Sequence, residues 1–362
     1  MYACQEGMVP AVVSAGWAAV ASGGNTLLDP QARRPLAAVD RVAEESAIRR
    51  SFAGIIARER TDRLLEIAAK WRPDLIVRDE VDFAGAIAAE VLGLPHAAVV
   101  VIAAGGFLRA DVIEESLAAL RSEHGLDPAG AMGMLHRYLT IVPGPPSFRD
   151  PADQLPPTAH YVRPAAVDQS QDHGLASSGS TRPTPERPKA YVTLGTIFNQ
   201  ESGDLFQRVL AGLAALPVDV VATVGHQIDP TELGPLPSNV RVESFVPLVQ
   251  MLRDTDVVVS NGGSGTVIAA LAFGIPQVLL PLGADQPLNA DRCVALGVGI
   301  ALDALHSTPT AIREATETVL TAETYPARAD QFRAEIASLP DARYPGTLLE
   351  TLAETRTPAP PA

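Results

Sequence analysis

Positive charge, and lysine above all, is scarce in this sequence. Lys and Arg together number 28 against 42 Asp and Glu, which gives a net charge of −14 at pH 7. Lys70 and Lys189 are the only lysines. An electrostatic field of this sign repels phosphate backbones and anionic lipids. The composition therefore argues against a role in binding nucleic acid and against a polybasic membrane contact.

Cysteines are few, and long apolar runs are missing. Cys4 and Cys293 lie too far apart to indicate a disulfide framework or a zinc site. The seven histidines include no pair at metal-ligand spacing. The longest nearly uninterrupted apolar run, residues 97–108, is too short to span a bilayer. The first residues lack the basic segment of a secretory signal. We therefore expect a cytoplasmic protein without integral membrane contact.

The sequence has ample material for two hydrophobic cores. It has 362 residues, 47% of them apolar and 19% charged, which favours two globular domains. Ten prolines fall between Pro143 and Pro188, and residues 169–180 within that stretch are rich in Gly and Ser. We expect one domain at residues 1–150, a linker at 151–188, a second domain at 189–340, and a C-terminal helix with a disordered tail at 341–362.

The second half alternates short apolar runs with helical stretches. This alternation is typical of a parallel β-sheet covered by helices on both faces. We expect strands at residues 190–194, 218–224, 240–244, 256–260, 277–281 and 299–302, and helices at 205–216, 266–273 and 289–296.

The first half shows the same alternation after an irregular start. We expect helices at residues 48–70 and 84–92 and strands at 75–77 and 97–102. Residues 1–35 offer only the short runs 9–13 and 17–20 as strand candidates, so the usual opening strand is either atypical or absent. The fold class is therefore α/β, with two parallel-sheet domains and a binding cleft at the carboxyl ends of their strands.

A glycine-rich turn follows the expected strand 257–259. Glycines at a turn from strand to helix let a ligand approach the backbone, and the free N–H groups at the helix start attract anions. The segment is neither a P-loop nor a G-x-G-x-x-G motif. A tight turn in which Ser or Thr merely caps the helix is the alternative. We expect a diphosphate site formed by Asn261, Gly262, Gly263, Ser264, Gly265 and Thr266.

An acid and an amide stand side by side after the next strand. Asp285 and Gln286 follow the run 278–281 and have the side chains that suit bidentate hydrogen bonds to vicinal hydroxyls. We expect them to bind a sugar. The alternative is that Asp285 only caps the helix that continues through Asn289.

Taken together, these segments resemble the donor half of GT-B nucleotide-sugar glycosyltransferases. The resemblance rests on Val246-Pro247, Asn261 to Thr266, Gly283 to Ala290 and Val192 to Thr196, in that family's spacing from about residue 189 to 305. More narrowly, these segments resemble the bacterial branch of that family, which is related to macrolide and enediyne glycosyltransferases and to UDP-glycosyltransferases. Residues 72–79 and 93–95 of the first half resemble the family more loosely.

The resemblance implies an inverting transfer of a hexose or deoxyhexose from a dTDP- or UDP-sugar to a hydroxyl of a small apolar natural product. It implies no cofactor and no obligatory metal, because the helix start stabilises the leaving diphosphate. In the family's pattern, Gly195 and Thr196 join the diphosphate turn, and Val246 and Leu248 flank the nucleobase. Asp79 matches the aspartate that orients a catalytic histidine. An ordinary exposed acid is the alternative for Asp79.

Three departures from the family pattern bear on activity. Asn261 stands where the family usually has His, and Leu248 where it commonly has Gln. The family's Gly-His turn after the opening strand is absent, so the general base is not identified and we expect an N-terminally truncated chain. A non-catalytic relative that only binds nucleotide or a partner protein is therefore the alternative. A nucleotide-sugar epimerase of the same fold would need an acid/base set that we do not find.

Overall fold

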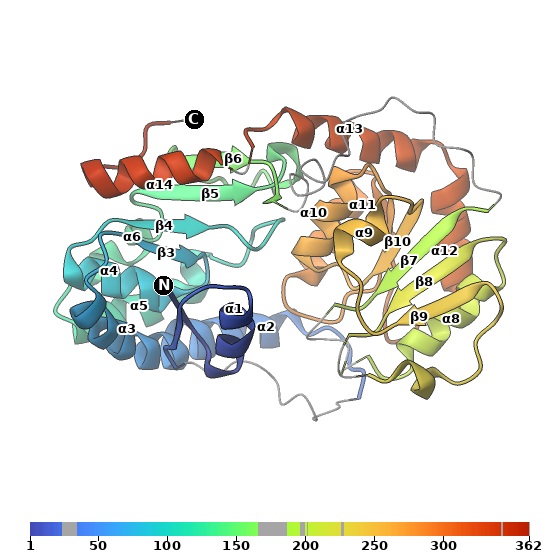
Figure 1. The fold of residues 1–362 in the computed structure, drawn as a ribbon, viewed down its shortest axis with the longest axis horizontal. Coiled ribbons are helices and arrows are strands. Elements are labelled where there is room, and N and C mark those ends of the chain that lie inside the picture. Colours follow the sequence, from blue (N-terminus) through green and yellow to red (C-terminus); the bar gives the residue numbers. More distant parts are fainter. Residues whose placement is uncertain are drawn as a thin grey trace.

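The chain folds into two α/β lobes that lie side by side (Figure 1). The computed structural model describes residues 1–23, 35–165, 187–195, 200, 202–225, 228–341 and 343–361. Each lobe is built on a parallel sheet, so the expected fold class is confirmed. In this described part of the chain, no helix combines the length and apolarity that a membrane crossing requires.

The N-terminal lobe holds four parallel strands in the order β3-β4-β5-β6. These are β3 (Ile76–Asp79), β4 (His96–Val99), β5 (Leu139–Pro143) and β6 (Ala159–Val162). The helices of this lobe are α2 (Arg41–Ala47), the π-helix η2 (Ile48–Ile56), α3 (Ala57–Trp71), α4 (Phe83–Leu92), α5 (Ala110–Glu123) and α6 (Ala131–Met134), with 3-10 turns η3 (Pro128–Gly130) and η4 (Pro146–Phe148). The expected helices and strands of residues 48–102 are confirmed within a few residues.

Local sequence explains the first strand–helix–strand unit of this sheet. Asp82 begins α4 by accepting a hydrogen bond from the Gly85 amide, and Gly93 ends it in the left-handed conformation at φ 62°. Residues 83–89 of this helix are all buried, which fits their small alanine side chains, whereas Val91 and Leu92 in its last turn are exposed. Residues 76–79 then pair in parallel with residues 96–99, so both strands end at the same edge of the sheet.

The first 23 residues form a separate small unit. The expected strand at residues 9–13 is wrong, because Val9–Ser14 is helix α1, with Pro10 in its first turn. β1 (Tyr2–Cys4) and β2 (Ala19–Ala21) pair in parallel as a two-stranded sheet, joined through the 3-10 turn η1 (Glu6–Met8) and α1. The expected strand at 17–20 therefore overlaps β2. Within the four-stranded sheet, β3 is an edge strand.

The C-terminal lobe holds six parallel strands in the order β12-β11-β10-β7-β8-β9. They are β7 (Lys189–Thr193), β8 (Asp219–Thr223), β9 (Val240–Glu243), β10 (Val257–Ser260), β11 (Gln277–Leu279) and β12 (Gly299–Ala301). Its helices are α8 (Leu205–Ala214), α9 (Leu248–Leu252), α10 (Ser264–Ala272), α11 (Gln286–Ala295), α12 (Pro309–Thr321) and α13 (Thr324–Ser338), with η6 (Pro230–Leu233) as a 3-10 turn. All six expected strands are confirmed, because their β-branched residues fill the core beneath α8 and α12.

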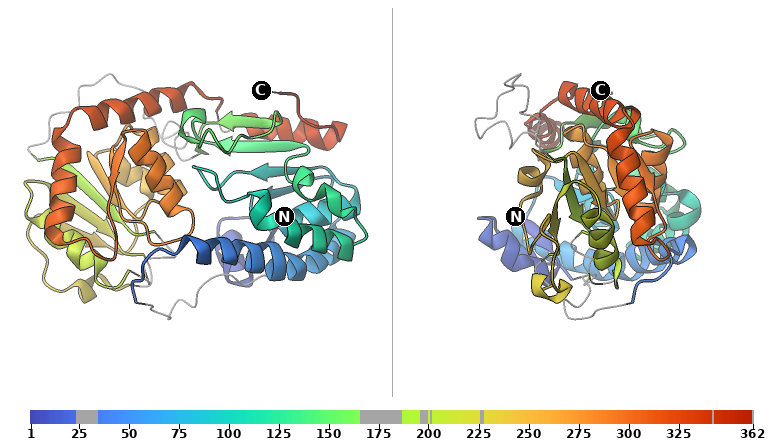
Figure 2. Two further views of the ribbon diagram at one scale, coloured as in Figure 1. Left: turned by 180° about the vertical axis from the view of Figure 1, so that it is seen from behind. Right: turned by 90° about the vertical axis from the view of Figure 1, so that its right-hand side faces the viewer.

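The chain's last helix returns to the N-terminal lobe. Figures 1 and 2 show α13 extending along the C-terminal lobe and α14 (Tyr344–Thr355) lying over the other sheet. Leu352 packs there with Leu139 and Ile141. The tail expected to be disordered instead bonds to this lobe, since the Ala359 amide donates to the Tyr138 carbonyl at 2.7 Å. β6 lies within the expected linker, and residues 166–186 of that linker fall outside the described residues.

Candidate functional site

The sheet order of the C-terminal lobe creates a switch point between β7 and β10. From β7 the chain runs outward through β8 and β9, and β10, β11 and β12 lie on the other side. Gly195 follows β7 with φ +74°, and a Cβ atom added there would lie 3.1 Å from Nδ2 of Asn261, which follows β10. Crevices at such switch points are where open parallel sheets bind ligands.

Asn261 lies buried at this switch point. It is 4% exposed, and its Oδ1 atom is buried without a hydrogen-bond partner in the described part of the chain. Asn261 and Gly195 follow strands that are far apart in the sequence, and the structure brings the two residues together. Thr196, the other residue expected on this side, lies outside the described residues.

The glycine-rich turn opens α10 without a side-chain cap. Gly262 has φ +80°, and a Cβ there would lie 3.3 Å from the Gln286 carbonyl oxygen, so only glycine fits without strain. Gly263 is the N-cap residue, and no described side chain caps the helix. Gly265 is exposed, with no atom within 4 Å of an added Cβ, and Thr266 is half-buried. The alternative in which Ser or Thr merely caps this helix is therefore not what the structure has.

Ser264 belongs instead to a partly buried polar network. Its hydroxyl donates to Oδ2 of Asp285 at 2.6 Å and accepts from Nδ2 of Asn289 at 3.0 Å. Asn289 also donates to Asp285 Oδ2 at 2.8 Å and to the Gly262 carbonyl at 2.9 Å. Asp285 occupies the N-cap position of α11 but makes no capping hydrogen bond. Its carboxylate thus faces the start of α10, and only Oδ2 is occupied by these bonds.

The N-terminal lobe completes this network. The Ala103 amide donates to Ser264 Oγ at 2.8 Å, and the Ala104 amide donates to Asn289 Oδ1 at 3.1 Å. Sequence reasoning missed Asn289, which is fully buried. Its position four residues after Asp285 on one helix was the available signal. The segment after β4 therefore lies directly on the first turn of α10.

Gln286, Val246 and Leu248, which were also expected to bind the donor, lie outside this network. Gln286 is 2% exposed, and its Oε1 accepts from the amides of Leu282 at 2.8 Å and Gly283 at 3.3 Å. The side-chain oxygen of Gln286 is therefore held by hydrogen bonds within its own loop. Val246 and Leu248 are half-buried against the apolar cluster beside β8 and β10, at the carboxyl end of β9.

Asp79 and Glu80 stand at the carboxyl end of β3. Asp79 is exposed, and its Oδ1 accepts from the amides of Val81 and Asp82, both at 2.8 Å. Loss of hydration on its protein side raises its pKa, as does Asp82. Glu80 is 1% exposed and accepts from the Val101 amide at 2.6 Å and the Ile102 amide at 2.5 Å. Glu80, next to Asp79, thus holds the start of the segment after β4 that reaches the network.

No described histidine hydrogen-bonds to Asp79. His96 is 1% exposed and packs edge-on against Tyr138, so it belongs to the core of the N-terminal lobe. His136 contacts Thr140 through Nδ1, and burial lowers its pKa to about 4. His226 lies outside the described residues.

The buried side chains of Glu80 and His96 should make the free energy of unfolding depend on pH in opposite directions. Burial raises the pKa of Glu80 from 4.5 to about 7, so the unfolded chain releases this proton first and stability falls as pH rises across that interval. We expect Glu80→Gln, which can still accept both amide bonds, to gain stability over wild type between pH 5 and pH 8. One pKa unit is worth about 1.4 kcal/mol, so the gain should reach about 3 kcal/mol. Urea unfolding at both pH values measures it.

His96→Leu is the matched comparison. Burial lowers the pKa of His96 from 6.5 to about 3, with Arg78 adding to the effect, so the unfolded chain takes up this proton first on acidification. The wild type therefore loses stability as pH falls below 6.5, and the Leu variant should lose less. A pH-independent difference from wild type in either variant would contradict the assignment for that residue.

Comparisons with known proteins point in one direction. Residues 3–158 match the model of the erythromycin biosynthesis protein CIII-like N-terminal domain, and residues 207–351 match that of its C-terminal domain. The chain is 34% identical over 252 residues to elloramycin glycosyltransferase ElmGT of Streptomyces olivaceus, an alignment that covers 66% of this chain and 60% of that protein. It is 29% identical over 314 residues to 3-alpha-mycarosylerythronolide B desosaminyl transferase of Saccharopolyspora erythraea, covering 81% and 72%.

The fold has a similar solved counterpart. Spinosyn rhamnosyltransferase SpnG complexed with thymidine diphosphate superposes with a TM-score of 0.75 at 25% identity, covering 97% of this chain and 90% of that one. The two lobes described above therefore have the GT-B arrangement.

Proposed function

The chain belongs to the erythromycin biosynthesis protein CIII-like family of GT-B glycosyltransferases, and we propose that it transfers a hexose or deoxyhexose from a nucleoside diphosphate sugar to a hydroxyl of a small, mainly apolar natural product. The observation that carries the proposal is the uncapped start of α10, which follows Asn261 and lies beside Gly195 at the switch point. Two similar proteins are named as a glycosyltransferase and a desosaminyl transferase. The alignment spans only 60% of ElmGT, so activity and substrates are proposals for this chain.

The donor diphosphate is assigned to the first turn of α10. Its uncapped N–H groups and the helix dipole favour a dianionic group, and Gly263 leaves space for close approach. Thr266 adds a hydroxyl, whereas the Ser264 hydroxyl is already used by Asp285, Ala103 and Asn289. The Asn261 amide lies between this turn and Gly195. Val246 and Leu248, at the end of β9, are assigned to the nucleobase. Thymidine diphosphate is the favoured donor nucleotide, because SpnG, at 25% identity, has been solved with it.

The sugar is assigned to Asp285 and Gln286. Asp285 Oδ1 accepts no hydrogen bond from the described residues, so it is available for a sugar hydroxyl next to the diphosphate. Gln286 can contribute its amide nitrogen, because its oxygen is held by the loop. The network through Asn289 fixes the carboxylate before the donor arrives, which lowers the entropic cost of binding.

The reaction is a single displacement with inversion. The acceptor oxygen forms a bond to the anomeric carbon while the bond from that carbon to the diphosphate oxygen breaks. The charge that develops on the leaving oxygen is stabilised by the N–H groups of α10. The acceptor proton passes to a general base, and Asp79 is assigned the role of orienting that base. Binding of nucleotide without any turnover would instead identify a non-catalytic relative.

The test of this function begins with nucleotide binding. The purified chain is titrated with dTDP and with UDP by calorimetry, without added metal, and then assayed for sugar transfer to a panel of phenolic acceptors. Binding of either nucleotide followed by formation of a glycoside supports the proposal. Absence of binding for both nucleotides would remove the donor site from α10.

Asp285→Ala should weaken donor use while leaving the fold intact. Removal of a carboxylate that holds a sugar hydroxyl costs about 1.5 to 3 kcal/mol, so affinity for dTDP-glucose should fall about tenfold or more. Affinity for dTDP, which has no sugar, should change by less than about threefold. Parallel titrations with the two ligands measure this separation.

The control is Asp291→Ala on the same helix. Asp291 is exposed and pairs with Arg41 at 2.6 Å, so its removal should alter neither titration. An equal loss of dTDP and dTDP-glucose affinity in Asp285→Ala would mean that Asp285 only holds the loop. Unchanged binding of both ligands would remove Asp285 from the site.

A further inference from the structure

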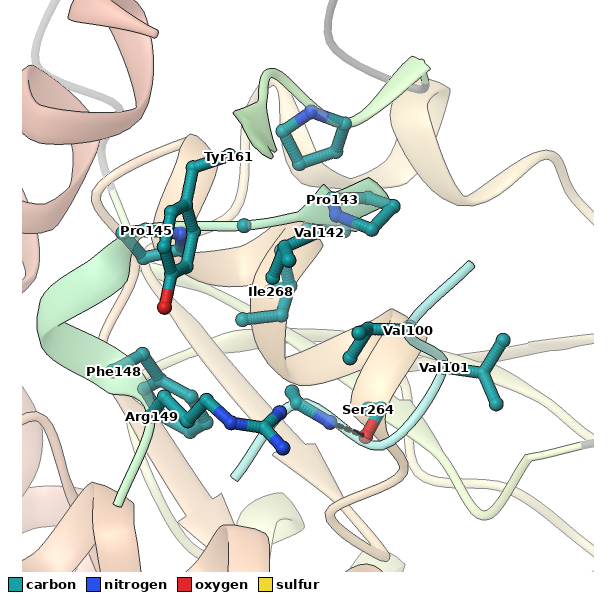
Figure 3. Close-up of a pocket in the computed structure, with 15 residues that line it drawn as sticks. Val100, Val101, Val142, Pro143, Pro145, Phe148, Arg149, Tyr161, Ser264 and Ile268 are labelled. Carbon is teal, nitrogen blue, oxygen red and sulfur yellow. Dashed lines mark hydrogen bonds between the residues drawn. The ribbon is translucent and has the colours of Figure 1, made fainter. Parts of the chain in front are cut away.

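A second feature of the interlobe region is a cavity of about 370 Å³ beside α10, which we name the Arg149 cavity. The ends of β4, β5 and β6 form one wall, and one face of α10 forms the other (Figure 3). Its volume lies within the range of small-molecule sites. The lining includes Val101, Arg149 and Tyr161 of the N-terminal lobe and Ser264 and Gly265 of α10.

Most of this lining is apolar, and one polar group stands out. Arg149 is 9% exposed, and its Nη1 atom is buried without a hydrogen-bond partner in the described part of the chain. Figure 3 shows its guanidinium projecting into the space between Tyr161 and Ser264. A buried donor without an acceptor costs about 1 to 3 kcal/mol, so a ligand oxygen that accepts this bond would recover that free energy.

The rest of the guanidinium is held in place. Nε donates to the Asp153 carbonyl at 3.0 Å, and Nη2 pairs with Asp153 Oδ2 at 2.9 Å. Gly105, at φ +80°, makes room for this pair, because a Cβ there would clash with Asp153 Oδ2. The donor is therefore oriented before any ligand binds, and a matching oxygen would be recognised by direction as well as by distance.

Charge balance decides what kind of oxygen fits. The charge of Arg149 is already compensated by Asp153, and the Glu80 carboxyl also lies within its electrostatic reach. A carboxylate ligand would add a second or third negative charge to a poorly hydrated, apolar space, which is costly. A carbonyl oxygen accepts the same bond without that cost.

We propose that the Arg149 cavity receives an uncharged, mainly apolar acceptor and holds one of its carbonyl oxygens at Nη1 of Arg149. This inference rests on the proposed function, because the cavity reaches Ser264 and Gly265 on the first turn of α10. Ser264 is also bonded to Asp285, so an acceptor in the cavity lies next to the proposed sugar position. Arg149 thus sets acceptor specificity without taking part in the displacement.

The test uses three fluorescent naphthols that differ at one position. The probes are 6-hydroxy-2-acetonaphthone, 6-ethyl-2-naphthol and 6-hydroxy-2-naphthoate, titrated against the full chain saturated with dTDP. The ketone should bind about tenfold tighter than the ethyl compound, as expected for one hydrogen bond to a charged donor. The carboxylate should bind no tighter than the ketone.

Two variants separate recognition from folding. Arg149→Met should reduce the preference for the ketone to within about twofold. Because Arg149→Met also removes the partner of Asp153, Val101→Trp serves as an independent variant that keeps the ion pair. Val101 is 45% exposed and lines the cavity, so the indole should block all three probes without unfolding the protein. Arg63→Met, an exposed arginine on α3, is the matched control and should change nothing.

The outcomes distinguish this inference from the proposed function. Normal dTDP binding with no ketone preference in the wild type would overturn the inference alone. A preference that survives Arg149→Met, or tighter binding of the carboxylate, would overturn it as well. A loss of dTDP-glucose affinity in Arg149→Met with unchanged ketone binding would assign the cavity to the donor sugar instead. Failure of dTDP to bind the wild type would count against the proposed function itself.

Discussion

Gly263→Val should abolish nucleoside diphosphate binding while the protein remains folded. At Gly263 φ is −62° and ψ is 139°, a conformation that valine adopts readily. The nearest heavy atom to an added Cβ is Asn261 Oδ1 at 3.8 Å, so the fold has room for the side chain. The isopropyl group would then cover the N–H groups of the first turn. The loss of two or more charge-assisted hydrogen bonds corresponds to about 100-fold or more in dTDP affinity.

Calorimetric titration with dTDP measures the loss of nucleotide binding, and a thermal melt shows whether the variant remains folded. Gly133→Val is the matched control, since an added Cβ there meets no atom within 4 Å. Gly262→Ala provides the contrast, because its φ of +80° and its contact with Gln286 should lower the melting temperature. Normal dTDP affinity in Gly263→Val would show that the diphosphate lies elsewhere.

Periodicity in the sequence was sufficient to predict the C-terminal lobe. Continuous runs such as 257–260 are buried on both faces, so they have no competing interpretation once helices flank them. The first 23 residues were harder, because Val9–Ser14 combines β-branched residues with a proline in its first turn. None of its residues is buried, so no core contact supports either conformation. Pro10 in the first turn favours a helix at this position.

The candidate site also has a part that the sequence predicts and a part that it does not predict. The glycine-rich turn and Asp285 could be predicted because each follows a strand of one sheet, and the carboxyl ends of parallel strands meet at one edge. The contact between Ala104 and Asn289 could not be predicted, because it joins residues 185 positions apart in different lobes. Arg149 gave no signal in the sequence, since its role depends on a cavity formed by three strand ends and α10.

Asn289→Asp should produce the largest loss of stability among the site variants. The substitution keeps the shape of the side chain and the oxygen that accepts from the Ala104 amide at 3.1 Å. It replaces the donor Nδ2 with an oxygen that faces Asp285 Oδ2 at 2.8 Å and the Gly262 carbonyl at 2.9 Å. Asn289 is fully buried, so the unpaired charge should cost on the order of 3 to 5 kcal/mol at neutral pH.

The sign of the pH dependence distinguishes this cause from general disruption. Two carboxylates at this distance, one of them fully buried, share a proton, so the pKa of the pair in the folded variant is raised above its unfolded value. The penalty is therefore present at pH 8 and is relieved as pH falls toward 5, which urea unfolding at both values will measure. Asn289→Ala loses the same donor without adding charge and should show little extra pH dependence. If Asn289→Asp and Asn289→Ala respond to pH alike, the carboxylates at positions 285 and 289 do not share a proton in the folded protein. Because that network joins the two lobes, Asn289→Asp should also weaken binding of dTDP-glucose more than that of dTDP, by freeing the Asp285 carboxylate from its fixed position.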